Sequence, residues 1–113
     1  MRDRLPARLE VSAILRLAES QGGFATVLAK GERDAGTILL VTVYRDEPSR
    51  LYERMPALDG SRSFVATKAE NPENPADFSE YLARRRRQDP DIWLIEVDIA
   101  NSERFVAQID ALT

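Results

Sequence analysis

The stretch TILLVTVYR, residues 37–45, decides the fold class of this 113-residue chain. The apolar residues at positions 38–41 and 43 would alternate between the two faces of a β-strand, so neither face suits water. The stretch is rich in β-branched residues and far too short to span a bilayer. It therefore predicts a central strand of a sheet that is covered on both sides.

Other strand-like segments flank this stretch and are separated from it by turn residues. Residues 24–30 and 63–67 are rich in apolar and β-branched side chains, and apolar and polar side chains alternate in residues 50–55. Short loops join these segments, including an Asp-Gly hairpin signal at residues 59–60. We therefore predict a meander of four antiparallel strands, with the central stretch as its second strand.

The first helix is predicted before the meander, and its beginning has two alternatives. Helical spacing of apolar residues supports a helix that begins after Pro6. Alternatively, Ser12 is the N-cap and residues 7–11 are extended. Both alternatives place a helix over residues 13–20.

Two more helices and a fifth strand follow the meander. The second helix has Pro75 in its first turn and ends before Pro90, because the residue before a proline is disfavoured in a helix. Residues 91–99 form the fifth strand, and Asn101 or Ser102 caps the last helix. The sequence thus predicts one α+β domain over the whole chain, with a mainly antiparallel sheet of about five strands and three helices packed on it.

The composition excludes several classes of chemistry. The chain contains no cysteine and no histidine, so it has no disulfide, no thiolate nucleophile, no imidazole base and none of the zinc sites built on these residues. An enzyme would depend on carboxylates, Lys, Arg and hydroxyl groups, or on a carboxylate-bound Mg²⁺. The net charge of −3 argues mildly against nucleic-acid binding as the main task. No signal peptide is evident, so we expect a cytoplasmic protein.

Four consecutive arginines, Arg84, Arg85, Arg86 and Arg87, are the first candidate site. Successive residues of a helix differ in direction by about 100°, so the four cannot share one face. Spacing from the apolar residues of the second helix places Arg85 and Arg86 along its core stripe and the other two toward solvent. The simpler interpretation is a solvated helix end, where the dipole favours cations; the alternative is an anion- or partner-binding site.

Two further pairs of polar residues are weaker candidates. Lys30 and Asp34 lie on one glycine-rich turn that matches no phosphate-binding motif, but the turn could bind a small ligand or a partner. Glu96 and Asp98 are two residues apart on the fifth strand, so their carboxylates share a face and could approach one Mg²⁺. A third ligand would be needed. The simpler interpretation is a strand leaving the core, with one acid paired to an arginine of the run.

Two blocks of the chain resemble a known family. The blocks PARLEVSAILRLAESQGGFATVLAKGERDAGTILL (residues 6–40) and YLARRRRQDPDIWLIEVD (residues 81–98) are similar to short bacterial proteins known only as a domain of unknown function, of the DUF1491 type. The resemblance is weakest in residues 45–74. It implies a small bacterial cytosolic protein and no particular activity, cofactor or catalytic residue. The family commonly has Gly-Asp-x-Asp-Ala-Gly where this chain has GERDAG, so Glu32 would replace the first acid.

Three functional hypotheses follow. The favoured one is a small non-enzymatic binding or regulatory module that acts through protein–protein contacts, with a second copy among its potential partners, because sheet edges invite pairing. The second is an RNA- or nucleotide-binding protein that uses the arginine run, with Lys30 and Arg33 nearby if the fold allows. The third is a Mg²⁺-dependent hydrolase that uses Glu96 and Asp98, with Asp34 as a further candidate. No cofactor is expected.

Overall fold

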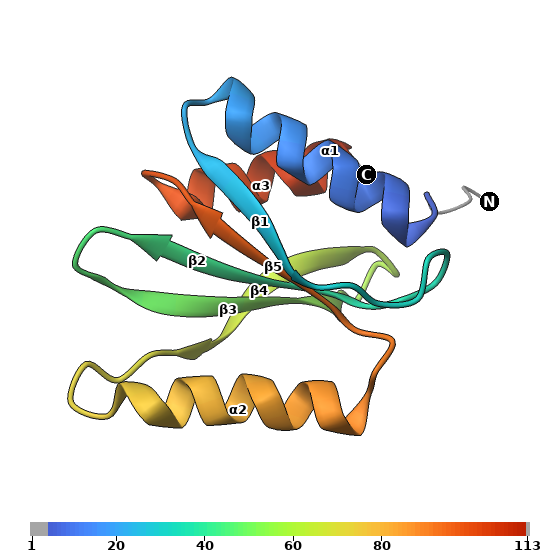
Figure 1. Ribbon diagram of the computed structural model, residues 1–113. Helices are drawn as coiled ribbons and strands as arrows, with labels where there is room; N and C mark the ends of the chain where they lie inside the picture. The colour runs from blue at the N-terminus through green and yellow to red at the C-terminus, as the bar shows by residue number, and fades with distance from the viewer. Residues whose placement is uncertain (1–4, 113) are drawn as a thin grey trace.

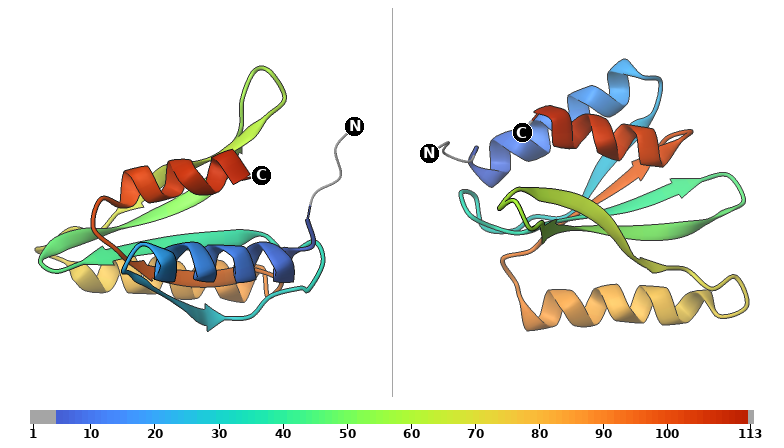
Figure 2. Two further views of the ribbon diagram at one scale, coloured as in Figure 1. Left: turned by 90° about the horizontal axis from the view of Figure 1, so that it is seen from above. Right: turned by 180° about the vertical axis from the view of Figure 1, so that it is seen from behind.

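A computed structural model describes residues 5–112 of the chain (Figure 1). The elements follow in the order α1 (Ala7–Ser20), β1 (Phe24–Ala29), β2 (Ile38–Tyr44), β3 (Glu47–Pro56), β4 (Arg62–Ala69), α2 (Pro75–Gln88), β5 (Trp93–Asp98) and α3 (Ser102–Leu112). The strands form one sheet, with α1 and α3 on one face and α2 on the other (Figures 1 and 2). The predicted α+β class, with five strands and three helices, is confirmed for the described residues.

The strand order is β1-β5-β2-β3-β4, and the sheet is antiparallel except for one pair. The strands β2, β3 and β4 form the predicted meander, but β1 does not pair with β2. Instead β5 lies between them, antiparallel to β1 and parallel to β2. Residues 93–95 of β5 are buried on both faces, which suits a central position, whereas β1 has one exposed face and lies at the edge.

Each face of the sheet packs on helices through a hydrophobic core. The larger core lies under α1 and α3 and includes, besides helix residues, Ile38, Leu40, Tyr52, Phe64, Trp93, Ile95 and Val97. The smaller core lies under α2 and contains Ala29, Leu39, Val41, Leu51, Phe78, Ile92 and Leu94. The residues of β2 and β5 alternate between the two cores, as their sequence predicted.

The helix α1 begins at Ala7, so the alternative with residues 7–11 extended is wrong. The buried residues Ala7, Val11, Ile14 and Ala18 lie at helical spacing and form one continuous apolar stripe along α1. The N–H groups at the start of the helix are also satisfied, because two of them donate to carbonyl groups of residues 33–34.

The hairpin between β2 and β3 differs from the prediction. The sequence placed a turn at residues 46–49, but β3 already begins at Glu47 and only Arg45 and Asp46 connect the strands. Arg45 has a positive φ of 50°, as two-residue hairpin turns require. The second helix begins with Pro75 as predicted. Within residues 5–112, no helix is long and apolar enough to cross a membrane.

Candidate functional site

Residues 30–37, the loop between β1 and β2, are held against the connection from α2 to β5. The N–H group of Glu32 donates to the carbonyl oxygen of Asp91 at 3.0 Å. The indole Nε1 of Trp93 donates in return to the carbonyl oxygen of Glu32 at 2.7 Å. The two sequence blocks that carry the family resemblance therefore meet in space.

The glycines of this loop allow close backbone packing. A Cβ atom added to Gly31 would come within 2.0 Å of the carbonyl oxygen of Asp91, and one added to Gly36 would come within 2.4 Å. No side chain fits at such distances, so the chain needs glycine at both positions. The glycine-rich turn thus has a structural explanation that involves no phosphate.

The acidic residues of the loop are engaged locally. The carboxylate of Glu32 accepts hydrogen bonds from the N–H groups of Asp34 at 2.9 Å and Ala35 at 2.5 Å. Asp34 forms an ion pair with Arg8 at 2.5 Å. Glu32 therefore stabilises the turn, and Asp34 is paired with α1 and not with Lys30.

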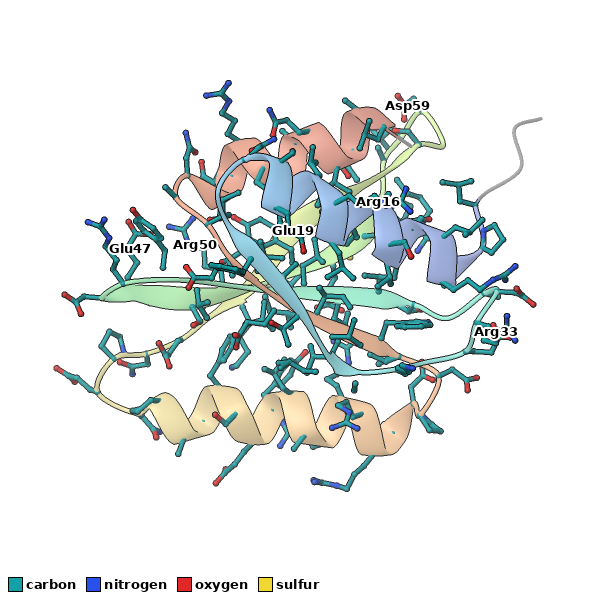
Figure 3. The ribbon with its side chains drawn as sticks, turned by 45° about the horizontal axis from the view of Figure 1, so that its top comes forward. Arg16, Glu19, Arg33, Glu47, Arg50 and Asp59 are labelled. Atoms are coloured by element: carbon teal, nitrogen blue, oxygen red, sulfur yellow. The ribbon has the colours of Figure 1, made fainter. Side chains whose placement is uncertain are left out.

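Exposed cations gather at this end of the molecule, where α2 ends and the loop turns. Figure 3 shows Arg33 here, at the opposite end of the sheet from Glu47. The loop is bonded to Asp91, which follows the arginine run by four residues. Four side chains here are exposed and form no ion pair within the described part of the chain: Lys30, Arg33, Arg86 and Arg87.

Arg85 differs from its neighbours in the run. Its Nη1 atom lies 2.8 Å from Oε1 of Glu53 on β3 and donates to the hydroxyl of Tyr81 at 3.2 Å. Burial acts to lower the pKa of Arg85, but hydrogen bonds and charge from Glu53 and Tyr81 outweigh it and leave the pKa raised. The prediction that Arg85 lies along the core stripe is confirmed.

The same prediction for Arg86 is wrong, because its side chain is exposed. The stripe of α2 that faces the sheet contains Phe78, Tyr81 and Leu82 and ends at Arg85. The helix ends three residues later, and the side chain of Arg86 lies outside this stripe and faces solvent. Arg84 is exposed as predicted, with its guanidinium 5.5 Å from the centre of the Tyr81 ring.

Glu96 and Asp98 lie on β5 opposite Thr26 and Phe24 of β1. Glu96 is half-buried and Asp98 is exposed. Asp34 lies in the loop bonded to Trp93, at the other end of β5, so it does not join them. Among residues 5–112, no group of three or more His, Cys, Asp or Glu side chains could hold a metal ion.

The other face of β3 carries a buried ion pair that the sequence did not indicate. Nη2 of Arg54 lies 2.6 Å from Oε2 of Glu10 on α1, with side-chain exposures of 14% and 7%. The Arg54 guanidinium also lies 4.5 Å from the centre of the Phe64 ring. The only available signal was that Glu10 precedes Ile14 by one helical turn and so falls on the buried stripe.

Two open clefts lie at the carboxyl ends of β2 and β5, with volumes of about 400 and 700 Å³. Tyr44 and Asn101 line both of them. In the smaller cleft, Arg50 is engaged by Glu103 at 2.9 Å. Asn101 caps α3, because its Oδ1 accepts a hydrogen bond from the N–H of Arg104 at 3.3 Å.

The two edge strands of the sheet are protected to different degrees. The strand β4 carries Arg62 and Lys68, and the N–H of its Phe64 donates to the carboxylate of Asp110 on α3 at 3.2 Å. Burial raises the pKa of Asp110, although this hydrogen bond opposes the shift. The strand β1 contains no charged residue, and Figure 2 (left) shows it at the rim with no helix outside it.

The exposed side chains of β1 are apolar at two positions. Phe24 is 71% exposed and Leu28 is 48% exposed, and Thr26 between them is also exposed. The strand has a bulge between Val27 and Ala29 relative to β5 but stays extended to its end. This face and the free backbone edge of β1 form what we call the β1 edge, residues 24–29.

The fold and these features define a small α+β protein with helices on both faces of a mainly antiparallel sheet and one unprotected edge. Residues 5–107 match the family described as "Protein of unknown function (DUF1491)", so the chain belongs to this family, as the sequence resemblance indicated. No curated protein matches the chain.

Solved structures of a family protein and of one further bacterial protein have the same fold. A crystal structure of a DUF1491 family protein from Caulobacter crescentus CB15 is 35% identical, with a TM-score of 0.75, covering 85% of this chain and 89% of that chain. An NMR structure of a DUF1491 family protein from the same organism is 33% identical, with a TM-score of 0.75 and coverage of 93% and 94%. The solution structure of protein Atu0922 from A. tumefaciens is 30% identical, with a TM-score of 0.70 and coverage of 88% and 89%.

Proposed function

We propose that this chain is a small non-enzymatic module that binds another protein through the β1 edge. The observation that carries the proposal is the contrast between β1 and β4. A free strand edge offers backbone N–H and C=O groups to any extended segment, and soluble proteins normally protect such edges with charges or covering elements. The edge of β4 has both kinds of protection, whereas β1 has no charge and exposes Phe24 and Leu28.

A partner could bind by adding an extended segment to the free edge of β1 as a further strand of the sheet. The backbone of the added strand would supply the hydrogen bonds, and alternate side chains would contact Phe24 and Leu28. Contacts of this kind need no catalytic group and no cofactor.

The test compares two lysine substitutions on exposed positions of the two edge strands. Thr26→Lys places a charge in the middle of the β1 edge, and Val65→Lys places the same charge on β4. Each purified protein is immobilised on a resin and incubated with an extract of the native cell. The captured proteins are then quantified by mass spectrometry. We expect Thr26→Lys to lose partners that the unchanged chain and Val65→Lys both retain. Equal capture by both variants would contradict the proposal, provided circular dichroism shows both folded.

A second candidate function, binding of RNA or a nucleotide, has support from the cluster of cations at the end of α2. The loop that carries Lys30 and Arg33 is bonded to Asp91, four residues after Arg87, while Glu32 and Asp34 are engaged by local contacts. Unpaired arginines are well suited to phosphate groups. The net charge of −3 and the lack of an exposed aromatic residue on this surface make this function the weaker candidate.

The RNA proposal is tested by fluorescence anisotropy of a single-stranded RNA oligomer at several salt concentrations. The double variant Arg86→Ala/Arg87→Ala removes two exposed cations, and Arg16→Ala/Arg104→Ala removes two exposed cations elsewhere. The slope of log K against log salt should fall by about 1.4 in the first variant, at about 0.7 for each lost phosphate contact. No binding at low salt, or equal slopes in both variants, would exclude the proposal.

The Mg²⁺-dependent hydrolase is the least supported candidate. Glu96 and Asp98 share a face, but the described residues supply no third carboxylate beside them. A rise in melting temperature with Mg²⁺ or Mn²⁺ that disappears in Glu96→Ala would support a site here.

We also propose that the protein comes from a bacterium and is located in the cytoplasm. The Caulobacter and A. tumefaciens relatives support a bacterial source, and the absence of cysteine fits a reducing compartment. Cell fractionation followed by immunoblotting tests the location.

A further inference from the structure

We infer that the β1 edge binds a second copy of this chain, paired antiparallel about a two-fold axis that passes Thr26. This inference rests on the proposed function and names its partner. The pairing would join two five-stranded sheets into one continuous sheet, with both α2 helices on one face and both α1–α3 pairs on the other.

The side-chain pattern of β1 is complementary to itself in this register. Antiparallel pairing about a two-fold axis normal to the sheet places residues of the same face opposite each other. Exposed and partly buried positions alternate along β1 up to Leu28 at the bulge, so with Thr26 opposite Thr26 of the second copy, Phe24 lies opposite Leu28 of that copy and Leu28 opposite its Phe24. The two most exposed apolar side chains of the strand would thus cover each other twice.

The distribution of charge favours this pairing over the other edge pairings. The chain has a net charge of −3, but β1 carries none, so two copies meet there without repulsion within the strand. Pairing of β4 with β4 would bring Arg62 and Lys68 of both copies together. Pairing of β1 with β4 would leave one free edge at each end and allow open-ended growth. Two-fold pairing of β1 closes the assembly and leaves the charged edges outside.

The absence of cysteine makes a cross-linking test unusually clean, because an introduced thiol is the only one in the chain. Residues directly opposite each other on antiparallel strands have Cβ atoms about 4.5–5.5 Å apart, and a disulfide requires only a small adjustment from that distance. Thr26→Cys should therefore form a disulfide-linked dimer under mild oxidation. Val65→Cys, an exposed edge position on β4, should remain largely monomeric. Equal cross-linking of both variants would overturn the inference.

The register is tested with two further variants. Phe24→Cys and Leu28→Cys should each cross-link poorly alone, because each thiol then faces Leu28 or Phe24 of the second copy and no second thiol. A mixture of the two proteins should form the heterodimeric disulfide several-fold faster than either alone. Equal rates in the mixture and in the separate samples would exclude the axis at Thr26.

Sedimentation separates this inference from the proposed function. One strand pairing is a small interface, so we expect a reversible dimer whose population rises with protein concentration. Thr26→Lys should remain monomeric at concentrations where the unchanged chain and Val65→Lys dimerise. If the unchanged chain is monomeric throughout and Thr26→Cys does not cross-link, the second-copy inference is wrong. Loss of captured partners in Thr26→Lys would even then support the proposed function, because that assay detects any protein at the β1 edge.

Discussion

Two neighbouring residues of β3, Glu53 and Arg54, connect the sheet to helices on its opposite faces. Glu53 pairs with Arg85 of α2 at 2.8 Å, and Arg54 pairs with Glu10 of α1 at 2.6 Å. The side chains of Arg85 and Glu53 are 26% and 16% exposed, whereas those of Arg54 and Glu10 are 14% and 7% exposed. The same two residue types therefore operate in different environments, because α1 and α3 enclose a larger core than α2 does.

The difference in burial between the two ion pairs indicates which face of the sheet is available for function. A buried ion pair is costly to break, since water cannot replace the missing partner. The face under α1 and α3 is thus committed to stability. The α2 side keeps its pair near solvent, and the exposed cations of the arginine run lie next to it.

The largest expected effect comes from breaking the buried pair. Arg54→Met leaves the carboxylate of Glu10 buried without its partner, so it should lower the free energy of unfolding by about 3–5 kcal/mol. Urea denaturation followed by circular dichroism measures the change. The double variant Glu10→Met/Arg54→Met should regain most of the loss, because two apolar side chains replace the pair. A loss below about 1 kcal/mol in the single variant would mean that the pair is hydrated and the two faces are alike.

A smaller effect is expected on the α2 side. Arg85→Met removes a partly exposed ion pair and a hydrogen bond to Tyr81, and it should cost about 1–2 kcal/mol. The matched control is Arg86→Met, the next residue of the same helix, which should stay within about 0.5 kcal/mol of the unchanged chain. If Arg86→Met costs more than Arg85→Met, the sequence-based placement of Arg86 along the core stripe would have to be restored.

The elements of the fold could be predicted from the sequence because their signals are local. The strand β2 and the strand β5 are apolar on both faces, and Pro75 and Pro90 bound α2. The position of β5 between β1 and β2 could not be predicted in this way. Strand order depends on which apolar surfaces meet across long stretches of chain, and neighbouring segments in sequence need not pair.

In the candidate site, too, local signals could be predicted from the sequence and long-range contacts could not. Helical periodicity placed Arg85 correctly, because the apolar stripe of α2 continues to it. The same periodicity could not identify Glu53 as its partner, since that depends on which strand α2 lies over. Neither residue of the Glu10–Arg54 pair has a local signal for the other, because 44 positions separate them in the chain.

The smallest expected effect lies at the tip of the β3–β4 hairpin, beyond both ion pairs. The Ser61 hydroxyl and the Ser61 N–H both donate to Oδ1 of Asp59, at 2.6 and 2.9 Å, and they hold the pKa of this exposed carboxyl below its ordinary value. A carboxyl with a lowered pKa in the folded state stabilises the fold above its ordinary pKa, and this contribution is lost as the pH falls through the folded value. Ser61→Ala removes the hydroxyl, so the pKa of Asp59 should rise toward its ordinary value in a ¹³C NMR titration. Ser61→Thr keeps a hydroxyl and should preserve the lowered pKa; if both variants titrate like the unchanged chain, the hydroxyl does not act on Asp59. In either variant the unfolding free energy at neutral pH should change far less than in Arg85→Met, because the tip is exposed and contacts neither core.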